Sequence, residues 1–472
     1  MSPRVAIVQF PGVNCEAETA RALRRVGLEP EIWRWTRAAS ELEPFDAYVV
    51  PGGFSYQDRV RAGALAAKHA LTETLVARAE QGAPVLGICN GAQVLAEAGL
   101  VPGGGGIELA LARNRMPGRA GYHARWVHVR VERSHCLFLS LLSPGELLPL
   151  PVAHGEGRFT AGDPARLQAL VEAGQTPLRY ATVAGSLASA FPDNPNGSEH
   201  AVAAVSNARG NVLAIMPHPE RAQTAGALSR AVGGRWGERR DAALGGVPAS
   251  AAVAEAEPAG PGLAIFAGPA RGRRVRPGRP ARRSGSPAGR PGAWAQAWIE
   301  LGSDDPEAMS ALTVARERLA AARRLLGLRR LRLFELHGPL PGATVIEDLV
   351  HRSTWFYNPH KERCRVRATP RSALEAAAGE QAVLVVERGG ARRPAAERWW
   401  RHETGAAIEV CEATTWLLRF ESGEDAAAAA RALAVLESLG RGLLCNPNAQ
   451  DHAIAAAAEI PLPWIATVGE GE

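Results

Sequence analysis

The sequence predicts a mixed α/β protein, in which a doubly wound, mostly parallel sheet is followed by a linker and two small α+β, ferredoxin-like units. Three observations indicate this organisation. Strand-like apolar runs alternate with helical stretches over residues 1–236, as in parallel sheets covered by helices. Residues 237–293 are rich in Pro, Gly, Ala and Arg and lack a sustained apolar period, which is typical of a disordered linker. From residue 294 strands and helices alternate again.

The first zone supplies the elements of the large sheet. The runs "RVAIVQF" and "AYVVPGG" are expected to be strands that end in turns, and "ARWVHVRV" and "GNVLAIM" continue the sheet. Helices are expected over residues 15–27 and 61–82, each closed by a glycine. Ligands of such sheets bind at the carboxyl ends of the strands. Phe10-Pro11-Gly12, Pro51-Gly52-Gly53 and Cys89 follow strands there, so we expect the functional site at this edge.

The charge of the chain is a local feature. The net charge is +6, but the stretch 271–290 holds eight arginines and no acidic residue, so the rest carries −2. A basic run of this kind is a solvated linker more readily than an RNA-contacting tail, and we do not expect a nucleic-acid partner.

Cysteine usage and hydropathy bear on the cellular location. The six cysteines are scattered without a CxxC pair, which indicates neither a disulfide framework nor a zinc site. No apolar run reaches membrane-spanning length, and the N-terminus enters a strand almost at once, without a secretory pattern. We therefore expect a cytoplasmic protein without a membrane partner.

The stretch "PVLGICNGAQVLAEAG" (84–99) places Cys89 between a buried strand and a helix. Gly87 and Gly91 lie two residues to either side, and residues without Cβ permit a sharp turn with close backbone approach. This is the arrangement of a nucleophile elbow, with cysteine as the nucleophile. The free N–H groups at the start of the helix favour a thiolate. The alternative is a buried structural cysteine.

The stretch "IMPHPE" (215–220) supplies a base and a group to orient it. His218 and Glu220 are two residues apart between prolines that favour extended backbone, so both side chains are expected to point the same way. A catalytic cysteine needs a base, and a group that orients this base, beside the thiol. Oxyanion donors are expected from Gly52 or Gly53 and from Asn90. The alternative is an incidental histidine in a surface loop and an ordinary Pro-Gly-Gly turn.

Five motifs occur in a specific order: "PGGFSYQDRVRAGA", "GICNGAQVL", "PVAHGEGRF", "NPNGS" and "MPHPER", with "FPGVNC" near the N-terminus. Over residues 3–230 the chain resembles the glutaminase subunits of phosphoribosylformylglycinamidine synthase, which are class I glutamine amidotransferases of purine biosynthesis. The resemblance implies a class I amidotransferase fold and a triad of Cys89, His218 and Glu220. Gln57 departs from the family, which commonly has glycine there.

The resemblance also implies contacts to the substrate. Gln93 is expected to help hold glutamine, and five residues are expected on loops around the pocket: His154, Glu156, Asn194, Asn196 and Ser198. Asn-Pro and Asn-Gly are also turn signals, so turn formation is the alternative for these loops. Cys15 is expected to be a second thiol near the site with a structural role, because it follows a loop and not an elbow.

Glutamine hydrolysis implies a consumer of ammonia. The sequence has no P-loop and no recognisable ATP-binding motif, so the resemblance places ATP and Mg²⁺ on a separate large synthetase subunit. No cofactor or metal is expected in this chain. The alternatives are a glutaminase that serves a different synthetase and a scaffold that does not catalyse.

The C-terminal zone predicts an internal duplication over residues 294–370 and 371–472. Asn-Pro follows a helix at 358–359 and again at 446–447, 88 residues later, and the order of elements repeats. The zone resembles the small accessory subunit of the same synthase. Residues 407–422 are expected to form a hairpin. Trp399 and Trp400 are expected to pack in a core or an interface, and a platform that stacks on nucleic-acid bases is the alternative. No catalytic set is visible, so the histidines and lysine of this zone are interpreted as surface or packing residues: His337, His360, Lys361 and His402.

Overall fold

The computed structural model describes residues 2–103, 106–119, 121–245, 258–269, 293–369, 379–389, 391–421 and 425–468. The chain divides into two compact units, residues 1–281 and residues 282–472. Among the described helices, none has the length and apolar content needed to cross a membrane. The arginine-rich stretch 271–290 lies outside the described residues.

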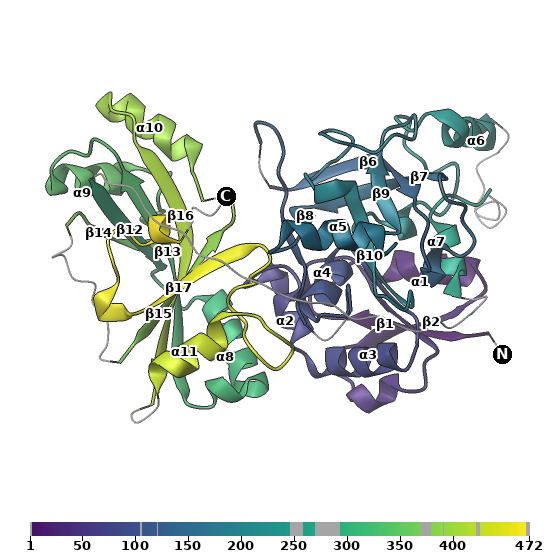
Figure 1. Ribbon diagram of the computed structural model, residues 1–472, viewed down its shortest axis with the longest axis horizontal. Coiled ribbons are helices and arrows are strands. Elements are labelled where there is room, and N and C mark those ends of the chain that lie inside the picture. Colours follow the sequence, from purple (N-terminus) through teal and green to yellow (C-terminus); the bar gives the residue numbers. More distant parts are fainter. Residues whose placement is uncertain are drawn as a thin grey trace. The chain divides into compact units, whose positions relative to one another are not determined.

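The N-terminal unit is built on a nine-stranded sheet (Figure 1). In sheet order its strands are β2 (Glu29–Arg34), β1 (Arg4–Gln9), β3 (Ala47–Val50), β4 (Val85–Ile88), β11 (Val212–Ile215), β10 (Val202–Ser206), β9 (Leu178–Ala181), β6 (His123–Val131) and β7 (Leu147–His154). The first five of these run parallel, and the other four extend the sheet in antiparallel fashion. The predicted large, mostly parallel sheet is therefore confirmed.

Helices and a small second sheet complete this unit. The helices are α1 (Glu16–Arg25), α2 (Ala64–Ala67), α3 (Ala70–Glu80), α4 (Asn90–Glu97), α5 (Pro164–Glu172), α6 (Gly234–Gly245) and α7 (Leu263–Ala267). The second sheet pairs β5 (Ala110–Arg113) with β8 (Glu156–Thr160). Helix α1 begins with acidic and ends with basic residues, which matches the helix dipole. Asp163 caps α5 by accepting from the Ala165 N–H at 2.9 Å.

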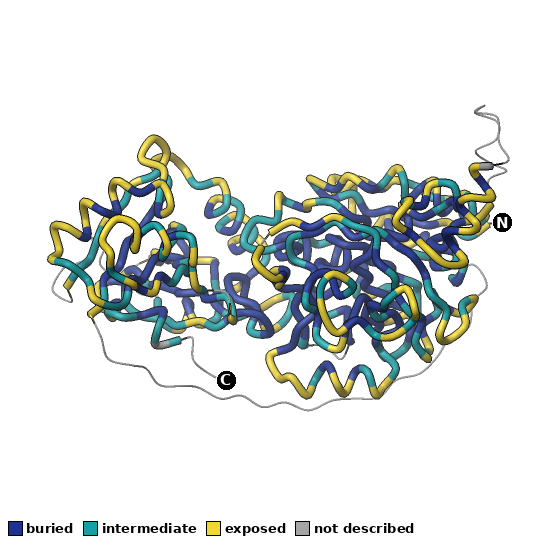
Figure 2. Tube along the Cα trace, turned by 90° about the horizontal axis from the view of Figure 1, so that it is seen from above, coloured by how far each residue is buried: buried dark blue, intermediate teal, exposed yellow. Residues whose placement is uncertain are grey.

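The core of this unit lies between the sheet and its helices. Every residue of β4, β10 and β11 is buried, as expected for strands that are covered on both faces. In Figure 2 buried residues, in dark blue, fill the interior of this unit, and exposed residues lie at its surface. Helix α4, which follows Cys89, is also buried along its whole length, so the site that it carries rests on a rigid part of the fold.

The folded N-terminal unit continues past residue 236, where the sequence predicts a linker. Helix α6 extends to Gly245, and residues 258–269 pack back onto the unit through α7. Leu263, Ile265 and Phe266 are buried there, and their burial explains why this short apolar run is ordered. The prediction of a disordered linker over 237–293 is thus wrong for these segments. The remaining parts, 246–257 and 270–292, lie outside the described residues.

The C-terminal unit is built on one six-stranded antiparallel sheet. In sheet order its strands are β14 (Glu362–Arg367), β12 (Trp294–Leu301), β13 (Leu325–His337), β16 (Glu409–Phe420), β15 (Gln381–Glu387) and β17 (Gln450–Ala456). The helices are α8 (Pro306–Arg318), α9 (Ala343–Arg352), α10 (Pro394–Thr404) and α11 (Ala426–Ala434). In chain order each half reads strand, helix, strand, helix, strand, and its first strand lies between its other two.

The two halves share this sheet instead of forming two ferredoxin-like units. Strands β13 and β16 pair from Leu325↔Phe420 to His337↔Glu409. Each half contributes three strands, and this long pairing covers the inner edge that each would otherwise expose. The predicted hairpin over 407–422 is wrong as well, because β16 is a single strand that is paired on both sides.

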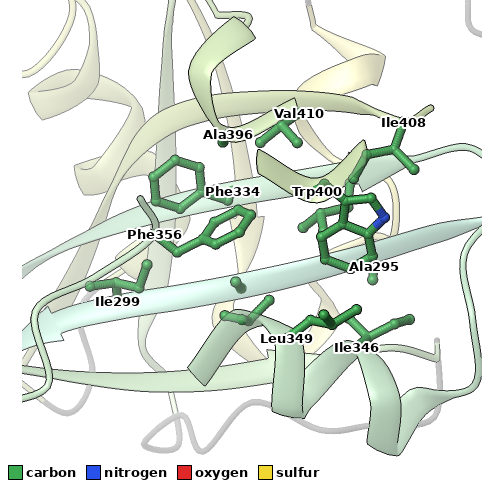
Figure 3. Packing of buried hydrophobic residues seen from close by; sticks show 13 residues of the cluster. Ala295, Ile299, Phe334, Ile346, Leu349, Phe356, Ala396, Trp400, Ile408 and Val410 are labelled. Atoms are coloured by element: carbon green, nitrogen blue, oxygen red, sulfur yellow. The ribbon is translucent and has the colours of Figure 1, made fainter. Parts of the chain in front are cut away.

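One face of the C-terminal sheet carries an aromatic core (Figure 3). Trp400 of α10, Phe334 of β13 and Phe356 are fully buried there, together with Ile346 and Leu349 of α9. Phe334 and Phe356 meet edge to face with ring centroids 5.3 Å apart, which is a favourable aromatic geometry. The prediction that Trp400 belongs to a core is confirmed, and Trp399 packs against the same cluster.

Candidate active site

Cys89 lies at the sharp turn between β4 and α4. Its backbone has φ 50° and ψ −104°, a conformation that is costly for a residue with a side chain. A Cβ at Gly91 would lie 1.8 Å from the Val50 carbonyl oxygen, and one at Gly87 would lie 2.6 Å from the Gly91 oxygen. Both glycines are therefore needed for the close approach of strand and helix. The predicted elbow is present.

His218 reaches Cys89 because their strands are neighbours. Strands β4 and β11 pair in parallel from Val85↔Val212 to Ile88↔Ile215, so their carboxyl ends lie side by side. Cys89 directly follows β4, and His218 comes three residues after the end of β11. The thiol of Cys89 is one of the groups that act electrostatically on the His218 ring. Two residues that are 129 positions apart in the sequence thus share one edge of the sheet.

Glu220 orients the imidazole of His218. The Nδ1 atom of His218 lies 2.5 Å from Oε1 of Glu220, and both side chains are buried. The backbone between them is not extended as the sequence analysis expected, because a 3₁₀ turn begins at Pro219. The turn still brings the two side chains together, so the contact survives although the local geometry was predicted wrongly.

The electrostatics of His218 favour a proton on its ring. Burial alone would lower the pKa of His218, but the negative charges of Glu220 and Cys89 hold that pKa well above its usual value. The other ring nitrogen, Nε2, is buried and has no hydrogen-bond partner among the described residues. An imidazole with one nitrogen held by a carboxylate and the other unengaged is arranged to exchange a proton with a neighbouring group.

Gly52 and Gly53 follow β3, the neighbour of β4 on the side opposite to β11. A Cβ at Gly52 would lie 2.8 Å from Cε1 of His218, so the backbone passes directly against the imidazole. On the other side of the elbow, the first N–H groups of α4 lack intrahelical acceptors. Backbone donors from two elements therefore lie around the Cys89 turn.

The Asn90 side chain is engaged within the protein. Its Oδ1 accepts from the Ser55 N–H at 2.9 Å, and its Nδ2 donates to Asp58 at 3.1 Å and to Gln93 at 2.9 Å. Only the Asn90 backbone N–H remains for an oxyanion. Gln93, the residue expected to hold glutamine, is buried and donates to the Glu156 carbonyl at 2.5 Å.

The predicted pocket loops mainly hold one another in place. The Asn194 side chain donates to the Ser198 carbonyl at 2.9 Å, and the Asn196 side chain donates to the Gly157 carbonyl at 2.7 Å. The Ser198 hydroxyl accepts from the Phe159 N–H at 3.1 Å. All three side chains are buried. These contacts match the turn-forming alternative and attach the loop to β8.

His154 and Glu156 interact with residues of the site: the charge of His218 acts on His154, and the Glu156 carbonyl accepts from Gln93. His154 Nδ1 is 3.0 Å from the Asn114 carboxamide oxygen. Burial, together with the positive charges of His218 and His123, lowers the pKa of His154 to about 3, so this ring is neutral. A Glu156 carboxylate oxygen accepts from the Ala62 N–H at 3.2 Å.

Sequence reasoning placed Cys15 near the site but did not identify Arg221 and Tyr122 as neighbours of the triad. Cys15, Arg221 and Tyr122 all adjoin the triad. The Arg221 guanidinium donates to Cys15 Sγ at 3.1 Å, and Cys15 is one of the groups that raise the pKa of His218. Burial and the charge of Cys89 raise the pKa of Tyr122. The signal for Cys15 was its place after β1, at the same strand edge as Cys89.

A metal ion is poorly accommodated by the same cluster. Ligand atoms of Cys15, His218 and Glu220 lie within 4.8 Å of one another and are buried, and sulfur, nitrogen and oxygen donors suit zinc. However, His218 and Glu220 already bond directly to each other, and the positive charge of Arg221 lies against the Cys15 sulfur. The first contact occupies ligand atoms that a cation would need, and the second places a positive charge where the cation would bind.

The loop after Gly53 is strained. Tyr56, Gln57, Asp58 and Val60 all have positive φ, between 53° and 69°. Gln57, at φ 59°, occupies the position where the resembling family commonly has glycine, and glycine adopts this conformation at no steric cost. Asp58 is tied to Asn90 beside the elbow, so the strain lies in the segment that supports the site.

The buried carboxyl group of Asp58 is expected to make the stability of the N-terminal unit depend on pH. Burial raises the pKa of Asp58 from 3.8 to about 6. The folded state therefore holds this proton more tightly than the unfolded chain, and the stability gained below about pH 4 is lost as the pH rises to about 6. We expect Asp58→Asn to stabilise the N-terminal unit by about 1–2 kcal/mol at pH 8 and to change little at pH 4. Urea unfolding at both values tests this, and an equal gain at both would contradict it.

Comparison with known proteins supplies the family. Residues 2–243 match the model of the CobB/CobQ-like glutamine amidotransferase domain. The chain belongs to this family. Among curated amidotransferases of this kind it is 47% identical over 234 residues to phosphoribosylformylglycinamidine synthase subunit PurQ of Methanothrix thermoacetophila, with 89% of that protein and 48% of this chain covered. It is 45% identical over 220 residues to the PurQ subunit of Thermus thermophilus, with 89% of that protein and 46% of this chain covered.

One chain of a solved structure is also similar to this protein. A chain of the PurLQS structure from Thermotoga maritima is 33% identical, with a TM-score of 0.39; the match covers 95% of that chain and 50% of this one. The family match ends at residue 243, so the C-terminal unit lies outside it.

Proposed function

We propose that the N-terminal unit is the glutaminase of a phosphoribosylformylglycinamidine synthase, which hydrolyses glutamine and supplies ammonia to a separate ATP-dependent synthetase subunit in purine biosynthesis. The observation that carries this proposal is the meeting of the Cys89 elbow with the bonded His218–Glu220 pair at one sheet edge. The identity of 47% across 89% of a PurQ subunit supports the choice of synthase.

The geometry implies a thioester mechanism. The Cys89 thiolate attacks the side-chain amide carbon of glutamine, and backbone N–H groups of Gly53 and Asn90 hold the oxyanion. His218, kept protonated by Glu220, gives its proton to the departing nitrogen, and ammonia leaves as the glutamyl thioester forms. His218 then takes a proton from water, which attacks the thioester and releases glutamate. The free Nε2 of His218 is the atom suited to both transfers.

The proposed partner is the large synthetase subunit. Because the sequence contains no P-loop, ATP and Mg²⁺ are expected on that partner, where the formylglycinamide ribonucleotide becomes its amidine. The Gln93 side chain is proposed to contact the substrate glutamine, as the family resemblance implies. This requires its present bonds to Asn90 and Glu156 to be exchanged or shared on binding.

The C-terminal unit is proposed to be an accessory-subunit-like duplication that helps assemble the complex. Its two halves repeat the same order of elements, and they pair with each other through their long strands β13 and β16. A covalent connection between the glutaminase and such a unit raises their effective concentration around a common partner. Among the described residues of this unit we find no second triad, and His337 stacks on Trp294 with ring centroids 4.0 Å apart, as a packing residue does.

A reconstituted assay tests the proposal. The full chain is combined with a large formylglycinamidine synthetase subunit, ATP, Mg²⁺ and the formylglycinamide ribonucleotide, and glutamate release and amidine formation are measured. We expect glutamine turnover to rise when the partner and its substrates are added. Turnover only with another synthetase would assign a different acceptor, and no turnover with any partner would indicate a scaffold.

A further inference from the structure

An oxyanion donor is useful only when its N–H already points at the position where charge develops. The Gly53 N–H is a candidate because it has no hydrogen-bond acceptor within the described part of the chain. Glycine on its own does not hold such an orientation, since its backbone is permissive. Another part of the protein must therefore fix the peptide between Gly52 and Gly53.

Residues 12–15 make that contact, and we call them the oxyanion clamp. The Gly52 carbonyl accepts from the Asn14 N–H and from the Cys15 N–H, both at 3.2 Å. Two residues further on, the Phe54 N–H donates to the Gly12 carbonyl at 2.9 Å. Val13 and Gly53 face each other in a short antiparallel bridge between these bonds. Gly53 is thus held from both sides, while its own N–H stays free.

The planarity of the peptide unit converts this contact into an orientation. In a trans peptide the C=O of Gly52 and the N–H of Gly53 point in opposite directions. Two donors on the Gly52 oxygen therefore aim the Gly53 N–H away from the clamp. We propose that the oxyanion clamp is a positioning element of the glutaminase site, which presents the Gly53 N–H to the oxyanion of the thioester-forming step. This proposal rests on the proposed glutaminase function.

Gly12 is the sensitive position in the clamp. Its φ is 92°, and an added Cβ would lie 2.1 Å from the Phe54 carbonyl oxygen and 3.0 Å from the Phe54 carbonyl carbon. Backbone atoms cannot change rotamer as a side chain can, so Gly12→Ala must displace the segment that contains Gly53 and Phe54. The three atoms nearest to the new methyl group belong to Phe54 and Ser55, and none of them belongs to Cys89 or His218.

The chain offers a matched control at Gly27. Its φ is 82°, close to that of Gly12, but an added Cβ would meet nothing within 4 Å. Gly27→Ala therefore carries a similar backbone strain without displacing the loop. Comparing the two variants in the full chain, with the large synthetase partner present, separates the cost of an unfavourable φ from the loss of the oriented donor.

We expect Gly12→Ala to lower kcat for glutamine hydrolysis by about 10²-fold, while KM changes by less than about threefold. Alkylation of Cys89 by iodoacetamide needs the thiolate but no oxyanion donor, so its rate is expected to stay within about twofold of the parent. Gly27→Ala is expected to keep both rates. Equal kcat values for the two variants, or a parallel loss of alkylation, would overturn the proposal.

A second variant guards against misfolding of Gly12→Ala. Asn90→Ala removes the carboxamide that holds the Ser55 N–H at 2.9 Å, which fixes the other end of the same loop, and it leaves the Asn90 backbone N–H in place. We expect a lower kcat with preserved alkylation, because the loop that carries Gly53 loses its support at Ser55. KM is not compared for this variant, since the same carboxamide also bonds Gln93. Unchanged kcat in a folded variant would contradict the proposal that this loop must be held in place for the Gly53 N–H to act. If the parent chain itself shows no glutamine turnover with any synthetase, the proposed function fails and not the positioning of Gly53.

Discussion

The Cys89→Ala variant is expected to lose glutamine-dependent amidine formation by about 10⁴-fold or more, while ammonia-dependent synthesis by the complex stays at the parent level. The physical reason is that alanine cannot form the thioester, whereas ammonia added from solution bypasses that step. The measurement compares amidine formation by the reconstituted complex with glutamine and with ammonium salts as the nitrogen source.

A second buried thiol gives the control. Cys136 is 4% exposed, and burial raises its pKa to about 12, so it is a neutral packing residue. Cys136→Ala is expected to cost about 1 kcal/mol of stability and to keep glutamine-dependent activity. If glutamine-dependent synthesis persists in Cys89→Ala, or falls equally in Cys136→Ala, the assignment of the nucleophile is wrong.

Glu220→Gln is expected to lower kcat for glutamine hydrolysis by about 10³–10⁴-fold with the fold preserved. Glutamine keeps the size of the side chain but removes the negative charge that lies 2.5 Å from His218 Nδ1. That charge is the main group that raises the pKa of His218. Its loss lowers this pKa, so a smaller fraction of His218 is protonated at neutral pH and available to protonate the leaving nitrogen.

The pH dependence of kcat/KM reports the change. The limb that belongs to His218 is expected to move to lower pH by roughly one unit or more in Glu220→Gln. Glu18→Gln serves as the control, because it removes the same charge from a residue that interacts with Arg221 and is not among the groups that act on His218. An unshifted profile in Glu220→Gln, or an equal shift in both variants, would show that Glu220 does not hold the imidazole.

Local sterics made much of the site predictable. Gly87 is required by a backbone contact within a few residues of the turn, that with the Gly91 oxygen, and such a contact leaves a readable spacing in the sequence. Gly91 is required by a more distant contact, that with the Val50 carbonyl oxygen of β3. The pairing of His218 with Glu220 is also short-range, so it was anticipated even though Pro219 begins a 3₁₀ turn instead of extended chain. The roles assigned to these residues remain predictions until the variants are measured.

Contacts between distant segments were not predictable in the same way. Nothing in the local pattern of Cys15 shows that Arg221 donates to its sulfur, because the two residues are 206 positions apart. The packing of residues 258–269 was hidden for the same reason, since their apolar run of four residues is too short to give a period. The two C-terminal halves join through the pairing of β13 with β16, and this pairing depends on the edge strand that each half exposes once it has folded.

The sequence by itself determined the α/β class of the chain, the sharp turn at Cys89 and the local His218–Glu220 pair, because apolar periodicity, the close contact between Gly87 and Gly91, and short-range spacing all act within a few residues. Only the tertiary structure decided that β4 and β11 are neighbours, that residues 12–15 donate hydrogen bonds to the Gly52 carbonyl, and that six C-terminal strands form one sheet. These features depend on backbone hydrogen bonds between segments that are far apart in the sequence. Such bonds are made by N–H and C=O groups that nearly every residue carries, so the residue types do not reveal them.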